Sequence, residues 1–205
     1  TGMWAAIGIL ALLRRRDRTG RGGVVNVSLL ETALEWVYQP AAEFLLTGRE
    51  PPRLGNASPI LVPYQVFDTA TAPVMIAAGN DRLYAKLCTV LGRPEWAGDG
   101  RFRRVPDRLA NRTALVPMLQ EVLRTRPQAE WCRLLDAEGV PNAPIRTVGE
   151  AARDVQTEAL GMILREPETG YAMYGLPLSI DGDRPAIRSR APELGEHSAA
   201  LLGKA

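Results

Sequence analysis

The sequence has very few residues of several chemically important kinds. It has a single histidine, His197, which excludes an internal His-rich zinc site, an HExxH protease and any reaction that needs two imidazoles. The two cysteines, Cys88 and Cys132, are too few and too far apart for a disulfide framework or a cysteine cluster on a metal. We therefore expect both to be buried apolar side chains, no metal site, and a reducing, cytoplasmic setting.

An excess of charge of one sign is also lacking. The chain has 25 basic and 23 acidic residues, a net charge of +2, whereas a nucleic-acid binder concentrates basic residues on one domain. The apolar run 3–13 has eleven residues, but a membrane span needs about 20. Arginines follow this run instead of preceding it, which is the wrong order for a signal peptide. We therefore expect neither a nucleic-acid nor a membrane partner.

The first 50 residues have the pattern of one part of an α/β domain. Residues 3–13 are apolar on every side, which predicts a helix covered by more than one neighbour. The β-branched run 24–29 predicts a strand, and Ser28 with Glu31 has the spacing of a capping box that opens a helix to about residue 46. The order helix, strand, helix suits a doubly wound parallel sheet whose other strands come from elsewhere.

Residues 51–150 read as a smaller α+β domain. Strands at 66–69 and 74–77 predict a hairpin, and Asn80 is a candidate N-cap of the next helix. Two further helices follow, one after Asn111 and one with Thr125 as its cap. Thr147 with Glu150 has the spacing of a capping box and predicts a further short helix. The arginines near the middle of the domain are interleaved with aspartates, which predicts a solvated surface that flanks a helix. They are Arg101, Arg103, Arg104, Arg108 and Arg112.

Residues 151–205 predict two extended pieces around residues 168–170 and a short terminal helix from about Glu196. The loop 55–59 has small residues that would let a ligand approach the backbone closely. The hydroxyls and carboxylates show no spacing that names a nucleophile. From the residues alone, the chain reads as an incomplete α/β protein with no identifiable catalytic group. We expect no tightly bound cofactor.

Several short motifs, taken in order, resemble the class III CoA-transferase family, also called the CaiB/BaiF family. The match spans essentially the whole chain, and its joint order is more specific than any one motif. The motifs include Thr1-Gly2-Met3, Thr19-Gly20-Arg21-Gly22, Val27-Ser28-Leu29-Leu30-Glu31, Gly55-Asn56, Pro63-Tyr64, Ala77-Ala78-Gly79-Asn80-Asp81, Asn111-Arg112, Gly139-Val140-Pro141 and Leu194-Gly195-Glu196-His197.

The resemblance implies a fold and an organisation of domains. Residues 1–50 would be the end of a large Rossmann-like domain with a linker, 51–150 the small α+β domain, and 151–205 a return to the large domain. Two subunits of such proteins interlock like linked rings. The fold would be incomplete in this chain, because the family's first part and its nucleophilic aspartate lie upstream of the segment that matches residues 1–3.

The resemblance also implies a reaction. An aspartate attacks an acyl-CoA thioester, the released CoA thiolate attacks the resulting mixed anhydride, and a second carboxylic acid then collects the CoA. Acyl-CoA and a carboxylic acid are the substrates, and this chain holds no catalytic residue of its own. The positions that match substrate or CoA contacts in the family are Leu29, Gly55, Asn56, Ala57, Ser58 and Pro59.

The loop 55–59 departs from one branch of the family. Formyl-CoA transferases carry a run of glycines where this chain has Ala57-Ser58-Pro59, and Ser58 stands where many members have histidine. This difference predicts an acceptor other than oxalate or formate. Two alternatives stay open: an enzyme similar to α-methylacyl-CoA racemase, which moves a proton beside the thioester, and a non-catalytic accessory domain.

Overall fold

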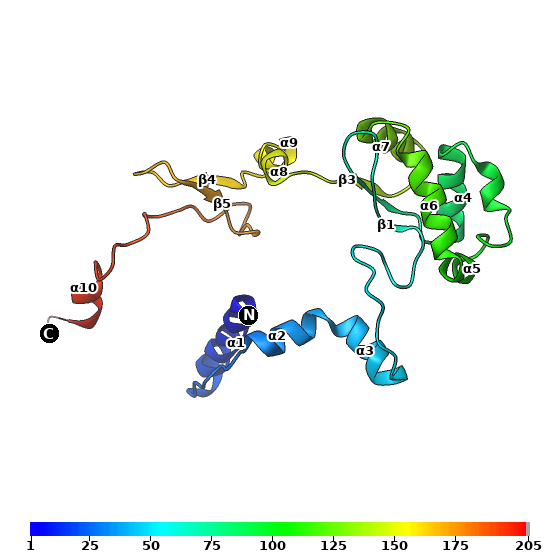
Figure 1. The fold of residues 1–205 in the computed structure, drawn as a ribbon. Coiled ribbons are helices and arrows are strands. Elements are labelled where there is room, and N and C mark those ends of the chain that lie inside the picture. The colour runs from blue at the N-terminus through cyan, green and yellow to red at the C-terminus, as the bar shows by residue number, and fades with distance from the viewer. Residues whose placement is uncertain (204–205) are drawn as a thin grey trace. The chain divides into compact units, whose positions relative to one another are not determined.

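The computed structural model describes residues 1–203 of the chain, which contains helices and two small sheets (Figure 1). Residues 1–66 with 77–116 form one compact unit, and residues 67–76 with 117 onward form a second. The boundaries that the sequence predicts near residues 50 and 150 stay predictions.

The N-terminal segment consists of three helices. They are α1 (Gly2–Thr19), α2 (Leu29–Trp36) and α3 (Tyr38–Thr47). Gly20 ends α1 and Gly48 ends α3, each with a left-handed backbone (φ 73° and 68°) that only glycine adopts without strain.

The predicted covering of the first helix is not present: none of the residues of α1 is buried. The segment around Val25 packs against one side of α1. A Cβ added to Gly8 would lie only 2.7 Å from a methyl of Val25. The other sides of α1 stay open, and Met3 and Leu10 are 69% and 65% exposed.

The predicted strand at 24–29 is not formed within the described residues. These residues pair with no neighbouring strand in the described part of the chain, and a strand without a partner has no ladder of hydrogen bonds. The cap that follows is confirmed, since the Ser28 hydroxyl accepts a hydrogen bond from the Glu31 backbone N–H at 3.1 Å. The predicted single helix to residue 46 is broken at Val37, because Pro40 has no N–H to donate to the Trp36 carbonyl.

The buried hydrophobic side chains of the described residues all lie between Val62 and Val140. This segment contains β1 (Tyr64–Phe67), β2 (Val74–Ala77), α4 (Asp81–Val90), the 3-10 turn η1 (Pro94–Ala97), α5 (Val105–Ala110), α6 (Arg112–Leu123) and α7 (Gln128–Ala137). With β3 (Asn142–Pro144) the strands form a sheet of order β1-β2-β3. β2 and β3 are antiparallel, and Met75 lies opposite Ala143.

Side-chain hydrogen bonds at the helix ends and at Trp131 help to hold this segment together. The Asn80 side chain caps α4 by accepting from the Leu83 N–H at 2.8 Å, as predicted. The predicted cap of α7 is wrong: its N-cap is Pro127, and the Thr125 hydroxyl donates instead to the Val122 carbonyl at 2.7 Å. Trp131 is buried, and its indole N–H donates to the Leu123 carbonyl at 2.7 Å.

The C-terminal part contains α8 (Val148–Ala152), α9 (Val155–Ala159), β4 (Ile163–Arg165), β5 (Ala172–Tyr174) and α10 (Ser198–Leu202). The predicted capping box is present: Thr147 accepts from the Glu150 N–H, and the Glu150 carboxylate accepts from the Thr147 N–H. The two extended pieces are the antiparallel pair β4 and β5, with Leu164 opposite Met173.

Candidate functional site

The loop 54–63 leads from the helical segment into β1, and it contains five of the six predicted substrate positions. Gly55 turns the chain with φ 62°. The Asn56 side-chain oxygen accepts from the Val66 N–H at 3.0 Å, and the Ser58 N–H donates to the Tyr64 carbonyl at 2.9 Å. The loop is therefore folded back on the start of β1 by hydrogen bonds at both residues.

The Ser58 hydroxyl is used inside the loop as well. It accepts from the backbone N–H groups of Ile60 and Leu61, at 3.3 and 3.2 Å. This is the short-range turn that serine side chains form with the backbone two or three residues on. Asn56 and Ser58 thus shape the loop, whereas Gly55 and Pro59 are exposed at its surface and Ala57 is half-buried.

Leu29, the sixth predicted position, lies on a separate element. It is the first residue of α2 and not the end of a strand, and its side chain is 79% exposed. A hollow of about 370 Å³ lies beside the start of α2, lined by Trp4, residues 26–28, Glu31, Thr32 and Glu35. Two of its lining residues are carboxylates, so its charge disfavours the phosphates of a nucleotide.

Two arginines outside the loop 54–63 donate hydrogen bonds to its backbone carbonyls, although both were predicted to lie on a solvated surface. For Arg108 that prediction is wrong, because its side chain is fully buried. Its guanidinium donates to the carbonyls of Val62 (2.7 Å), Phe102 (3.0 Å), Arg103 (3.4 Å) and Gly79 (2.9 Å), and to Asp81 Oδ1 (2.9 Å). All of its N–H donors are occupied, which is the condition under which a buried charge is tolerated.

Arg112 is the second of these arginines, at the start of α6. Its Nη2 donates to the Ser58 carbonyl, and the side chain is half-buried. Burial lowers the pKa of Arg112, because leaving water disfavours the charged form. The spacing Asn111-Arg112 was part of the family resemblance, but neither arginine was predicted as a contact of the loop.

The groups around Arg108 include two that can lose a proton. Its guanidinium lies 4.6 Å from the centre of the Tyr84 ring. Burial raises the pKa of Tyr84, and burial raises the pKa of Cys88 to about 11. Cys88 is therefore a protonated, apolar thiol at neutral pH, as expected from the sequence, whereas Cys132 is only half-buried.

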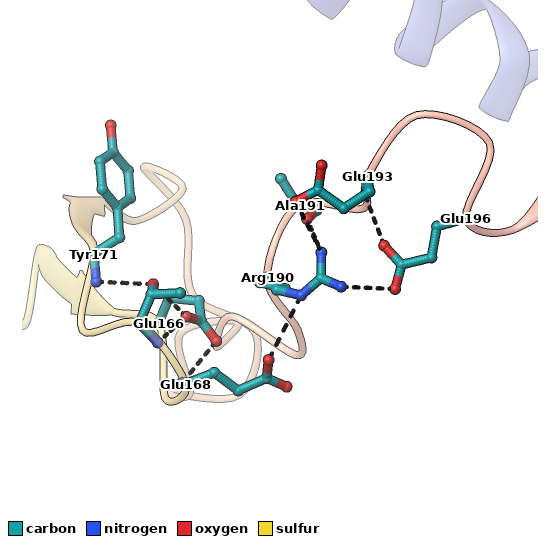
Figure 2. A network of polar contacts seen from close by, with 8 residues as sticks. Glu166, Glu168, Tyr171, Arg190, Ala191, Glu193 and Glu196 are labelled. Carbon is teal, nitrogen blue, oxygen red and sulfur yellow. Dashed lines mark hydrogen bonds and ion pairs between the residues drawn. The ribbon is translucent and has the colours of Figure 1, made fainter.

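A second polar cluster lies in the C-terminal segment (Figure 2). The Thr169 hydroxyl donates to the Glu166 carboxylate, as do the backbone N–H groups of Glu168 and Thr169, and these bonds lower the pKa of Glu166. Arg190 pairs with Glu196 at 2.8 Å and with Glu168 at 3.7 Å. The bonds of Glu166 hold the β4–β5 turn, and Arg190 links Glu168 in that turn to Glu196 near the start of α10.

The described residues were also searched for a metal site and for a membrane-spanning helix. Within residues 1–203, no three His, Cys, Asp or Glu side chains lie close enough to hold a metal ion together. In the same part of the chain, no helix combines the length and hydrophobicity needed to cross a bilayer.

Comparison with known proteins shows that this chain is similar in sequence to CoA-transferases. It is 38% identical over 201 residues to the acetyl-CoA:oxalate CoA-transferase of Acetobacter aceti, covering 98% of this chain and 51% of that protein. It is 32% identical to the succinyl-CoA:glutarate CoA-transferase of Mus musculus, covering 98% and 47%. The chain thus spans about half the length of the curated relatives it matches.

The fold agrees with the sequence comparison. A CAIB/BAIF family protein from Brucella suis superposes with a TM-score of 0.82 at 34% identity, over 98% of this chain and 53% of the other. The predicted α/β class and family fold are therefore confirmed. The model of CoA-transferase family III matches residues 1–198, and the chain belongs to this family.

Proposed function

We propose that this chain is the small domain and supporting part of a CoA-transferase that moves CoA from an acyl-CoA thioester to a carboxylic acid. The observation that carries the proposal is the match to CoA-transferase family III over residues 1–198. The two relatives named above are CoA-transferases that differ in their acids, oxalate in one and glutarate in the other. Family membership therefore supports the reaction type more strongly than any one substrate.

The proposed mechanism uses an aspartate that would precede Thr1. Its carboxylate attacks the thioester carbonyl, the CoA thiolate leaves, and an aspartyl-acyl anhydride forms. The thiolate then attacks the aspartyl carbonyl and releases the acyl group as a carboxylate, which leaves an aspartyl-CoA thioester. The acceptor carboxylate repeats the two steps in reverse and departs as the new acyl-CoA, so no proton or electron is gained or lost.

The roles proposed for the chain's own residues are supporting ones. Leu29, exposed on α2, would pack against CoA, and the loop Gly55, Asn56, Ala57, Ser58 and Pro59 would approach the reacting end of the substrate. We propose further that the complete protein acts in the cytoplasm as an interlocked dimer. It would bind coenzyme A only as part of a substrate.

The test is an assay of the protein expressed from its complete reading frame. Succinyl-CoA and acetyl-CoA are supplied with oxalate, glutarate or formate, and the new acyl-CoA is measured by chromatography. Transfer, together with a CoA adduct on one aspartate detected by mass spectrometry, would support the proposal. Oxalate belongs in the assay because Ala57-Ser58-Pro59 predicts against it, whereas one relative is named for it.

The same preparation separates the alternatives. A racemase would exchange the α-hydrogen of a 2-methylacyl-CoA with solvent deuterium and would transfer no CoA. An accessory domain would do neither. We expect residues 1–205 alone to transfer no CoA, because the proposed nucleophile is not among them, and turnover by this piece would refute the proposed aspartate.

A further inference from the structure

The loop 54–63 is attached to the rest of its unit at three successive points. The Ser58 carbonyl accepts from Arg112, and the Val62 carbonyl accepts from Arg108. Between them, Leu61 packs against Gly79 so closely that a Cβ on Gly79 would lie 2.9 Å from the Cβ of Leu61. Two arginines four residues apart on the chain therefore hold two carbonyls that are also four residues apart.

The two arginines do different work. Arg108 is fully buried, bonds to four carbonyls and pairs with Asp81, so it fastens several segments to one another. Arg112 is half-buried, and its hydrogen bond in the described part of the chain is to the Ser58 carbonyl. Loss of Arg108 would disturb the whole neighbourhood, whereas loss of Arg112 would free the loop alone.

The contact of Arg112 lies at the centre of the candidate site. Ser58 is the residue whose N–H bonds to Tyr64 and whose hydroxyl holds Ile60 and Leu61. The guanidinium therefore binds the residue that makes three of the hydrogen bonds that shape residues 57–61. To make this bond, the Arg112 guanidinium is moved partly out of water. Removing a charged group from water costs free energy that an uncharged side chain would not cost.

We propose that Arg112 is a positioning residue, which sets the conformation of the loop 55–59 through the Ser58 carbonyl and thereby the binding of the acyl-CoA substrate. The part about substrate rests on the proposed function, in which this loop approaches acyl-CoA. The part about the loop rests on the geometry alone. The two parts are therefore tested separately.

The first test measures backbone hydrogen exchange by mass spectrometry on residues 1–205. Arg112→Gln is compared with Arg112→Lys, which keeps one charged donor, and with Arg82→Gln, an exposed arginine on α4. We expect amides of residues 57–61 to exchange about ten-fold or more faster in Arg112→Gln, with α4 and α7 unchanged and Arg112→Lys intermediate. Unchanged loop exchange, or equal acceleration in α4, would overturn the proposal.

The second test measures steady-state kinetics on the protein from its complete reading frame. A disordered substrate loop weakens binding, so Arg112→Gln should raise KM for acyl-CoA about ten-fold while kcat changes about two-fold or less. Arg112→Lys should recover part of the loss, and Arg82→Gln should match the unchanged protein. A lowered kcat with the same KM would indicate a loss of folded enzyme and would overturn the positioning role.

The two tests also distinguish this proposal from the proposed function. If the unchanged protein transfers no CoA, the proposed function fails, and so does the role of Arg112 toward acyl-CoA. Hydrogen exchange still decides whether Arg112 holds the loop, because it needs no substrate.

Discussion

Gly79 shows at the scale of one residue how closely the loop 54–63 is packed. A Cβ at this position would lie 2.9 Å from both Cβ and Cδ1 of Leu61. The Gly79 carbonyl accepts a hydrogen bond from buried Arg108. Because Leu61 cannot withdraw its own Cβ without moving the loop, Gly79→Ala should destabilise the protein by about 1–3 kcal/mol. Gly100→Ala is the control, since nothing lies within 4 Å of a Cβ there. Equal urea midpoints for both variants would contradict the packing argument.

Cys88 is the residue for which the structure predicts a pH effect. Burial raises its pKa from 9.0 to about 11, so between these values the unfolded chain releases a proton that the folded chain retains. Stability falls with pH wherever the unfolded state binds fewer protons. The contribution of Cys88 is thus complete below about pH 9 and is lost as pH rises toward 11.

The measurement is the free energy of unfolding from pH 8 to 11 in the unchanged protein and in Cys88→Ala. Tyr84 and Cys132 also have raised pKa values, and both proteins contain them. Because Tyr84 interacts with Cys88, the difference in slope reports the Cys88 thiol together with its effect on Tyr84. We expect the free energy of unfolding to fall less steeply with pH in Cys88→Ala than in the unchanged protein. Parallel curves would show that this thiol titrates normally in the folded chain.

At the scale of elements, α4 depends on its cap. The Asn80 side chain satisfies the Leu83 N–H, one of the donors that a helix leaves without a partner at its start. We expect Asn80→Ala to lower the free energy of unfolding by about 0.5–2 kcal/mol, and Asn80→Asp to retain most of it. Chemical denaturation followed by circular dichroism measures both. A loss as large in the aspartate variant would indicate that Asn80 acts through something other than the cap.

The elements also show where local pattern was sufficient. The caps at Ser28, Asn80 and Thr147 depend on residues three apart in the chain, and all three were predicted correctly. α5 was not predicted, because its arginines and aspartates are typical of an exposed segment. Arg108 is buried there since carbonyls from Val62 and Gly79, distant in sequence, converge on it.

At the scale of the whole chain, the three N-terminal helices expose much apolar surface. Trp36 is 77% exposed, and Leu45 and Leu46 are 81% and 86% exposed. Large exposed apolar surfaces associate in water. We therefore expect residues 1–205 by themselves to form oligomers, which light scattering coupled to size-exclusion chromatography would detect. The double variant Leu45→Ser/Leu46→Ser should reduce the association, and a monodisperse monomer of the unchanged chain would refute this prediction.

The sequence by itself determined the family, the α/β class and the helix caps at Ser28, Asn80 and Thr147, because these depend on motifs in order and on contacts between near neighbours. It also predicts that the loop 55–59, with its small residues, approaches the substrate, and this stays a prediction. Only the tertiary structure decided that residues 24–29 pair with no strand of the described residues and that Arg108 is buried. It also showed that Arg112 holds Ser58. Each of these depends on partners distant in sequence, and no local pattern records whether such a partner is there.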